Sequence, residues 1–209
     1  MYKAVIFDFD GVILDSEGYH YLAWKEVLKR YFDLEESFYV TIKSMGRRAI
    51  LEAAANHYNV PISEEEKDQL LADKAVVYKR ITGVFTEKNL VKGIKAYLER
   101  IHDKVKIGLA TSSTLYHDYL VQFDLYKYFD AITDATIKAP LKPAPDIYLI
   151  TAKKLGVDPK DCLVYEDSVI GIKAAKNAGM HCIGIGKKEY LSQYVDETVE
   201  NFDELKKDL

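Results

Sequence analysis

The chain has 209 residues, of which 48% are hydrophobic and 30% are charged, and its formal net charge is −4. This length allows a full core, with room for one large domain or for a domain with an insertion. The composition is that of an ordinary soluble protein. Since it contains no block of basic residues, it gives no electrostatic argument for a nucleic-acid partner.

The N-terminus carries a single early lysine and reaches Asp8 after four apolar residues, which fits neither a secretory signal nor a membrane span. The two cysteines, Cys162 and Cys182, each begin a separate apolar run. That position predicts small buried side chains and not a disulfide or a metal pair. We therefore expect a cytoplasmic protein without a membrane partner.

The first predicted element is a strand at residues 4–7, an uninterrupted apolar run typical of a strand buried on both faces of a parallel sheet. Asp8 ends the run, Asp10 follows two residues later, and Gly11 permits a sharp turn. If the extended geometry continues, both carboxylates project from the same side of the strand's carboxyl end. Two carboxylates so close repel, so we expect either a proton or a cation there. On this stretch alone, an ordinary polar turn after a strand is the alternative.

Residues 16–81 are predicted to form a helical unit inserted after the first strand, because no strand pattern interrupts them. Apolar residues recur at three- and four-residue spacings across 17–32, and a second helix is predicted at 47–58. A third helix opens at Ser63, where Glu66 completes a capping box, and runs to the end of the unit.

Residues 82–209 alternate between helix and strand patterns and, together with residues 1–15, are predicted to form an α/β core domain. Such alternation indicates right-handed βαβ units and therefore a doubly wound, Rossmann-like parallel sheet, with five strands when the first is counted. The later strands are expected at 104–110, 129–133, 163–165 and 182–185, and the helices at 90–101, 116–123, 146–155, 169–178 and 202–209.

Polar residues follow three of the predicted strands, and a lysine lies in a proline-containing loop between them. They are Asp8 and Asp10, Thr111-Ser112-Ser113, Glu166-Asp167-Ser168, and Lys142 in the run Lys142-Pro143-Ala144-Pro145-Asp146. Because parallel strands open their carboxyl ends on one edge, these groups are expected to converge. Carboxylates are hard ligands that suit Mg²⁺, while a threonine and a lysine can bind an anionic group. The set predicts phosphoryl transfer, in which a carboxylate attacks while a metal and a lysine neutralise the oxygens.

Each of these features also has a structural explanation when it is taken alone. The Thr-Ser-Ser run can cap the following helix. Glu166 and Asp167 can be acidic residues that favour a helix N-terminus. A lone loop lysine such as Lys142 is usually solvated.

The run Asp8-Phe9-Asp10-Gly11-Val12 resembles the first motif of the haloacid dehalogenase superfamily of phosphotransferases. Thr111, Lys142 and the pair Glu166-Asp167 match its second, third and fourth motifs, so the resemblance spans the chain. A helical cap after the first strand is similar to the arrangement in the β-phosphoglucomutase-like sugar phosphatases.

The resemblance implies that Asp8 is the nucleophile, which forms an aspartyl-phosphate, and that Asp10 is the general acid and base. It implies a Mg²⁺ ion held by Asp8, the carbonyl of Asp10 and Asp167. Glu166 would lie near the metal, either as a ligand or through a water molecule.

The resemblance further implies that Thr111, Lys142 and the backbone N–H of Ser112 bind the phosphoryl oxygens.

Three residues of the helical unit are candidates for contacts with the substrate. His20 lies close in sequence to the first motif, although a packing or surface role is the alternative. Arg47, at the start of the second predicted helix, is suited to a second phosphate or to polar sugar groups, or is simply solvated. Lys74 resembles a cap lysine that reaches the substrate in β-phosphoglucomutase, but it also fits an exposed helix position.

Two activities compete within the family, because a phosphatase passes the phosphoryl group to water whereas a mutase returns it to a bound sugar. The features that resemble the mutase are Asp15, Ser16, His20, Lys74 and the run from Lys142 to Asp146. The departures are Ala49 in place of an arginine that grips the far phosphate, Thr114-Leu115 without an asparagine, and Ala75 in place of an asparagine. Losing a bidentate phosphate contact should weaken a bisphosphate intermediate most.

We therefore predict a Mg²⁺-dependent phosphatase that acts on a small phosphorylated sugar or similar metabolite, with β-phosphoglucomutase as the alternative. A non-enzymatic phospho-receiver is a remote alternative, since receivers also cluster Asp, Ser or Thr, and Lys at strand ends. Receivers place the phosphorylated Asp on a later strand, where only Asp134 is available, and lack a helical insertion of this size. We expect the protein to be a monomer.

Overall fold

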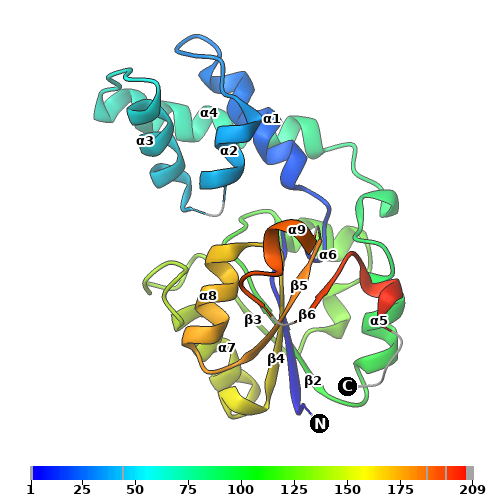
Figure 1. Ribbon diagram of the computed structural model, residues 1–209. Helices are drawn as coiled ribbons and strands as arrows, with labels where there is room; N and C mark the ends of the chain where they lie inside the picture. Colours follow the sequence, from blue (N-terminus) through cyan, green and yellow to red (C-terminus); the bar gives the residue numbers. More distant parts are fainter. Residues whose placement is uncertain (1, 44, 187, 196, 206–209) are drawn as a thin grey trace. The chain divides into compact units, whose positions relative to one another are not determined.

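The apolar run at the start of the chain forms β1 (Ala4–Phe7), and all four of its residues are buried. β1 pairs in parallel with β2 (Lys106–Ala110) on one side and with β4 (Cys162–Glu166) on the other. A continuous hydrophobic run is typical of such a central strand. The sheet has the order β3-β2-β1-β4-β5-β6, all parallel, and its outer strands are β3 (Ala131–Thr133), β5 (His181–Ile185) and β6 (Glu197–Val199) (Figure 1).

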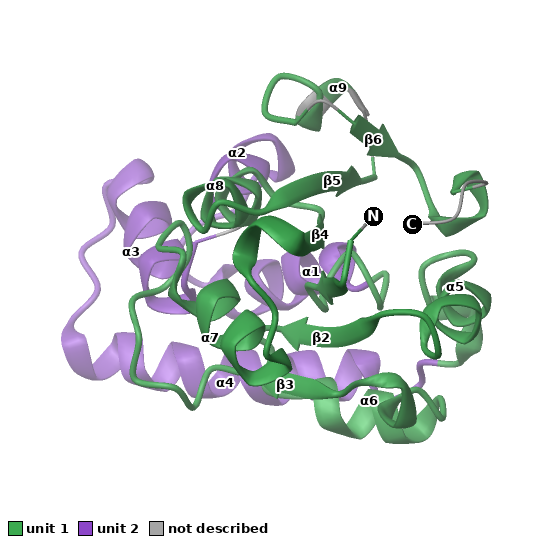
Figure 2. Ribbon diagram, turned by 90° about the horizontal axis from the view of Figure 1, so that it is seen from below, with its two compact units in different colours: residues 1–15, 86–209 green, residues 16–85 purple. Residues whose placement is uncertain are grey.

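The computed structural model describes residues 2–43, 45–186, 188–195 and 197–205. The chain divides into a unit that contains the sheet, made of residues 1–15 and 86–209, and a helical unit of residues 16–85 (Figure 2). The helical unit extends beyond residue 81, where the sequence pattern placed its end. The reason is that α4 (Glu64–Thr82) continues until Gly83 ends it.

Helices cover both faces of the sheet (Figure 2). Alternate residues of β1, Ala4 and Ile6, belong to one buried cluster with residues of α7 (Asp146–Leu155) and α8 (Val169–Asn177). Successive side chains of a strand point to opposite faces, and the Phe7 ring contacts Tyr97 of α5 (Ile94–Ile101). The doubly wound α/β fold predicted from the sequence is therefore confirmed. The remaining elements of this unit are α6 (Tyr116–Gln122), α9 (Lys188–Leu191), η1 (Glu87–Asn89), η2 (Tyr126–Tyr128), η3 (Pro159–Asp161) and η4 (Phe202–Glu204).

Several boundaries in this unit differ from the sequence prediction. β6 is a sixth strand that the pattern missed, because three residues at a sheet edge are too few to show a period. The helix predicted at 90–101 begins only at Ile94, since Gly93 precedes it in the left-handed conformation with φ of 82°. The helix predicted at 202–209 is a short 3₁₀ turn at Phe202–Glu204, and its last four residues lie outside the described ones.

The helical unit is built around one apolar cluster that includes Trp24, Leu28, Leu51 and Leu70. Its helices are α1 (Glu17–Leu28), α2 (Glu36–Ile42), α3 (Arg47–His57) and α4. α1 ends earlier than predicted, and α2 was not predicted, because its sequence ESFYVTI is rich in β-branched and aromatic residues. Burial of Tyr39 and Ile42 in the cluster overrides that weak propensity. In the part of the chain that is described, every helix is too short or too polar to cross a bilayer.

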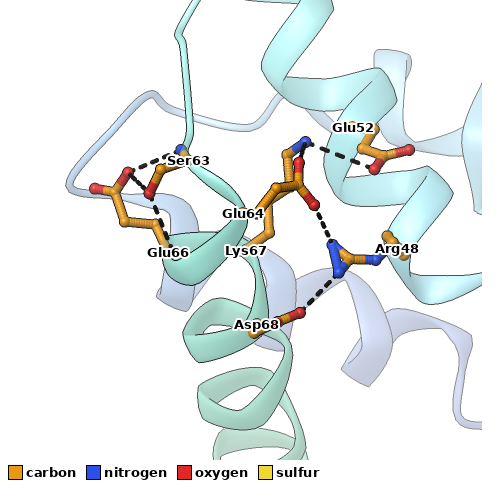
Figure 3. Close-up of polar contacts among 7 residues, drawn as sticks. All are labelled: Arg48, Glu52, Ser63, Glu64, Glu66, Lys67 and Asp68. Carbon is orange, nitrogen blue, oxygen red and sulfur yellow. Dashed lines mark hydrogen bonds and ion pairs between the residues drawn. The ribbon is translucent and has the colours of Figure 1, made fainter.

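Polar contacts connect the start of α4 to α3 (Figure 3). The Ser63 hydroxyl accepts a hydrogen bond from the Glu66 backbone N–H, and the Glu66 carboxylate accepts one from the Ser63 N–H at 2.9 Å, which confirms the predicted capping box. Arg48 of α3 pairs with Glu64 at 3.2 Å and with Asp68 at 2.7 Å. Because these side chains are exposed, the ion pairs orient the two helices more than they stabilise them.

Candidate active site

The chain turns sharply directly after β1, at the carboxyl edge of the sheet. The Asp8 backbone N–H still donates to the Tyr165 carbonyl at 3.1 Å, so Asp8 continues the pairing with β4. Gly11, with φ of 77°, then folds the chain back, and its N–H donates to the Leu14 carbonyl at 2.8 Å. A bend at Phe9 separates Asp10 from β1, and Asp10 forms an isolated parallel bridge with Leu14, so the strand does not continue unbroken through Asp10 as expected from the sequence.

The strand register places the motif residues next to one another at the carboxyl ends of the strands. Phe7 lies opposite both Leu109 of β2 and Tyr165 of β4, so the three strands end side by side. Asp8 and Thr111 directly follow β1 and β2, and Glu166 ends β4 with Asp167 after it, so these residues occupy one edge of the sheet, where open α/β sheets bind ligands.

Lys142 reaches this edge from the loop before α7. Its ammonium donates to Asp8 Oδ1 at 2.8 Å and to Glu166 Oε1 at 2.6 Å, and its side chain is only 12% exposed. The loop itself is held by the Asn177 side chain, which donates to the Pro143 carbonyl at 3.0 Å. The alternative of a solvated loop lysine is therefore wrong.

Glu166 is fully buried and accepts hydrogen bonds on both oxygens. Oε1 accepts from Lys142 and from the Tyr148 hydroxyl at 2.8 Å, and Oε2 accepts from the Ser168 backbone N–H at 3.1 Å and from its hydroxyl at 2.9 Å. Burial by itself would raise the pKa of the Glu166 carboxyl, but the charge of Lys142 and these hydrogen bonds outweigh it and lower the pKa. Glu166 is thus a stable carboxylate.

Asp8 has the opposite balance. Burial, together with the charges of Glu166 and Asp167, raises its pKa well above the usual value despite the attraction of Lys142. One oxygen from each of Asp8, Glu166 and Asp167 lies within 4.8 Å of the others. These three carboxylates form a cluster of acidic side chains, of which Asp8 and Glu166 contact the Lys142 ammonium. A divalent cation would offset their mutual repulsion, and hard carboxylate oxygens are the ligands that Mg²⁺ takes, so the residues fit such an ion.

Two glycines make room for the carboxylates. A Cβ atom on Gly11 would overlap the Asp167 side chain, and a Cβ atom on Gly171 of α8 would overlap the Glu166 carboxylate. Close approach of this kind excludes any side chain at either position without a shift of the acidic residue.

Thr111 and Ser112 lie at the same edge, after β2. The buried Thr111 donates its backbone N–H to the Thr133 carbonyl at 2.9 Å, and its hydroxyl oxygen accepts from the Ser113 N–H at 2.9 Å, while Ser112 is exposed. The hydroxyl proton of Thr111 can still be donated. The alternative in which this run caps the next helix is wrong, since α6 begins after Leu115 without a side-chain cap.

Comparison with known proteins identifies the family. Residues 2–179 match the profile of the haloacid dehalogenase-like hydrolase family. The chain belongs to this family. A β-phosphoglucomutase of Bacillus subtilis is 36% identical over 189 residues, which cover 88% of this chain and 84% of that protein. A fructose-1-phosphate phosphatase of Escherichia coli is 30% identical over 187 residues, which cover 88% of this chain and 96% of that protein.

The solved structures support the same placement. The structure of a β-phosphoglucomutase from Clostridium difficile has a TM-score of 0.89 and 33% identity, and the match covers 99% of this chain and 94% of that one. The chain is therefore an enzyme of the haloacid dehalogenase-like hydrolases, with β-phosphoglucomutase-like relatives, as its four motifs predicted.

The candidate cap residues of this hydrolase lie in its helical unit. Lys74 is buried, which rules out the exposed helix position, and its ammonium lies 2.7 Å from His20 Nδ1. The His20 ring stacks on Tyr78 with centroids 4.1 Å apart, and Lys74 also lies over the rings of Tyr78 and Trp24. An ammonium donor at Nδ1 assigns the proton of a neutral His20 ring to Nε2. Arg47 is exposed at the first position of α3.

Two further residues contact the site of the hydrolase without having been singled out from the sequence. Tyr148 follows the Lys142 motif closely, but a tyrosine in the apolar stripe of a helix is usually a core residue. Gly171 lies within α8, where the sequence shows no turn that calls for a glycine. The sequence feature that points to Gly171 is the serine three residues before it, which is a common residue at the start of a helix. In the structure, Ser168 caps α8 by accepting a hydrogen bond from the Gly171 N–H at 3.0 Å.

Proposed function

We propose that this enzyme is a Mg²⁺-dependent phosphatase that hydrolyses a small phosphorylated sugar through a phosphorylated Asp8. The main support is the environment of the Asp8 carboxylate. It lies 2.8 Å from the Lys142 ammonium, at the strand edge where open α/β sheets bind ligands, and it belongs to a cluster of three carboxylates. A carboxylate, a cation and a set of hard oxygen ligands are the groups that phosphoryl transfer through an acyl phosphate requires.

In the first step, an Asp8 oxygen forms a bond to phosphorus and the bond from phosphorus to the sugar oxygen breaks. Asp10 donates the proton that the leaving oxygen requires. In the second step, Asp10 takes a proton from water, whose oxygen bonds to phosphorus as the bond to Asp8 breaks. Inorganic phosphate leaves, and both carboxyl groups return to their starting states.

The other residues of the edge bind and orient the phosphoryl group. Lys142 places a positive charge on its oxygens, and the Thr111 hydroxyl and the Ser112 backbone N–H donate to them. Asp8, the carbonyl of Asp10 and Asp167 would hold Mg²⁺, with Glu166 close to it. The ion supplies positive charge that stabilises the phosphoryl oxygens and favours ionised Asp8.

A β-phosphoglucomutase is the second candidate, because the contact between His20 and Lys74 joins two residues that resemble the mutase. The absence of an arginine at position 49 argues against it, since Ala49 cannot grip a second phosphate. Arg48 is a poor substitute because it already pairs with Glu64 and Asp68. Arg47, His20 and Lys74 remain the residues that we propose for substrate recognition.

The test is a panel of sugar phosphates, with p-nitrophenyl phosphate as a generic substrate, assayed for release of inorganic phosphate with Mg²⁺. We expect multiple turnovers, reversible loss of activity with EDTA, and no turnover by Asp8→Asn, which keeps the shape of the side chain but removes the nucleophile. β-Glucose 1-phosphate is assayed in parallel for conversion to glucose 6-phosphate. Fast isomerisation without phosphate release would establish the mutase instead, and Mg²⁺-dependent activity in Asp8→Asn would exclude Asp8 as the nucleophile.

A further inference from the structure

Glu166 accepts as many hydrogen bonds as a carboxylate can. Lys142 and Tyr148 donate to Oε1, at 2.6 Å and 2.8 Å, and Ser168 donates to Oε2 through its backbone N–H and its hydroxyl. A carboxylate has about four lone-pair sites, so these four donors occupy both oxygens. The whole side chain is buried, so water does not compete for it.

We propose that Glu166 positions Lys142 and does not ligate the metal, and that Tyr148 is the residue that keeps it in this role. This inference deepens the function proposed above and rests on it. To bind a cation directly, Glu166 would have to release one of its donors inside the protein, where an unpaired hydroxyl or N–H is unfavourable. The Asp8 side chain is 14% exposed and Asp167 is also partly exposed, whereas Glu166 is not, so Asp8 and Asp167 remain the side-chain ligands of the acidic cluster.

Tyr148 is placed to control how strongly the Glu166 carboxylate attracts the Lys142 ammonium. Its hydroxyl bonds to the Glu166 oxygen that Lys142 also contacts, and its ring lies 4.9 Å from the Lys142 ammonium. Both Tyr148 and Glu166 are fully buried. Without the hydroxyl, Lys142 is the only remaining donor to Oε1 among the residues that the structure describes, and Glu166 attracts the ammonium more strongly. Lys142 is then drawn away from Asp8 and from the phosphoryl oxygens.

The first experiment compares Tyr148→Phe with the wild type in calorimetric titrations with inorganic phosphate, a probe of the Lys142 subsite, in the presence of Mg²⁺. We expect phosphate affinity to fall about tenfold, which is the size of effect that follows from losing one hydrogen bond to a charged group. With a phosphomonoester substrate, KM rises by a similar factor. Mg²⁺ affinity changes by less than about twofold, because the hydroxyl contacts no proposed ligand.

Tyr97→Phe is the matched control. Tyr97 is also buried in the same unit, and its hydroxyl lies 2.6 Å from the Tyr165 hydroxyl, so the variant also loses a buried hydrogen bond. It should lower the thermal stability about as much as Tyr148→Phe but leave phosphate affinity unchanged. Equal phosphate affinities in Tyr148→Phe and the wild type, or equal losses in both variants, would overturn the role of Tyr148.

The second experiment separates metal ligation from positioning by titrating Mg²⁺ alone into Glu166→Gln and Asp167→Asn. Each variant removes one negative charge from the same cluster, so a difference between them reports direct ligation. We expect Asp167→Asn to weaken Mg²⁺ binding at least about tenfold more than Glu166→Gln. Equal losses would make Glu166 a ligand and overturn the proposal. The titrations in both experiments measure equilibrium binding, so they stand even if the wild type fails to hydrolyse any phosphomonoester, a result that would contradict only the proposed function.

Discussion

Asp8 must be ionised to attack phosphorus, yet its surroundings favour the protonated form. Burial and the carboxylates of Glu166 and Asp167 raise its pKa, and Lys142 offsets this only in part. Lys142 in turn keeps its charge, because Asp8 and Glu166 raise its pKa although burial acts to lower it. Ionisation of Asp8 in these surroundings lowers the stability of the folded protein, and the proposed reaction requires that ionisation.

The substitution Asp8→Asn should therefore stabilise the metal-free protein at neutral pH. Since the folded state binds the Asp8 proton more tightly than the unfolded chain, the free energy of unfolding of the wild type falls as pH rises above the unfolded pKa of about 4. Asp8→Asn has no ionisable group at this position, so this fall in the free energy of unfolding does not occur in the variant. In EDTA at pH 7 its Tm should exceed that of the wild type by about 2–4 °C for each kcal/mol relieved, and the gap should shrink towards pH 4.

Thermal denaturation followed by circular dichroism measures this difference. A wild type that is more stable than Asp8→Asn at pH 7 in EDTA would show that the contact with Lys142 outweighs burial.

Helix α8 contributes to the site through its first turn. Ser168 caps the helix and donates to Glu166, and Gly171 lies against the Glu166 carboxylate. The helix therefore holds the acidic side chain from two directions, by a hydrogen bond and by a close contact that only a glycine permits.

The variant Gly171→Ala should lose activity and stability, contrary to helix propensity. Alanine is usually favoured over glycine within a helix by about 1 kcal/mol, but here the added methyl group overlaps the buried carboxylate. Overpacking costs about 1–3 kcal/mol, so Tm should fall, and kcat/KM should drop at least about tenfold because Glu166 shifts away from Lys142.

Gly18→Ala is the control for this prediction, since Gly18 lies in α1 with open space around its Cβ position. Its Tm should stay the same or rise. A Gly171→Ala enzyme with wild-type activity and a raised Tm would contradict the close contact with Glu166.

For the protein as a whole, the acidic cluster couples metal binding to folding. The Asp8 carboxylate lies far along the chain from those of Glu166 and Asp167, and the two segments meet only in the folded sheet. A cation that binds this arrangement and not the unfolded chain stabilises the fold by mass action.

We expect Mg²⁺ at one hundred times its dissociation constant to stabilise the protein by about 2.7 kcal/mol, which raises Tm by about 5–10 °C. EDTA should reverse the shift. Differential scanning calorimetry with and without Mg²⁺ measures it, and Asp167→Asn is the control in which the shift should largely disappear. An equal shift in that variant would place the stabilising cation elsewhere on the protein.

The sequence by itself determined the features that depend on short stretches. Apolar runs define β1, β2, β4 and β5, a capping box starts α4, and the strand ends carry Asp8, Thr111 and Glu166 with Asp167. These follow from local periodicity and turn chemistry, and parallel pairing then brings the polar ends to one edge.

Only the tertiary structure decided which contacts these residues make and therefore which role each has. The folding of α2 depends on burial in the helical cluster, and β6 forms only because β5 offers it an edge. Glu166 of β4 accepts a hydrogen bond from Tyr148 of α7, and its carboxylate fits against α8 only because Gly171 has no side chain. No local pattern encodes such contacts, because each requires the packing of segments that are separate in sequence.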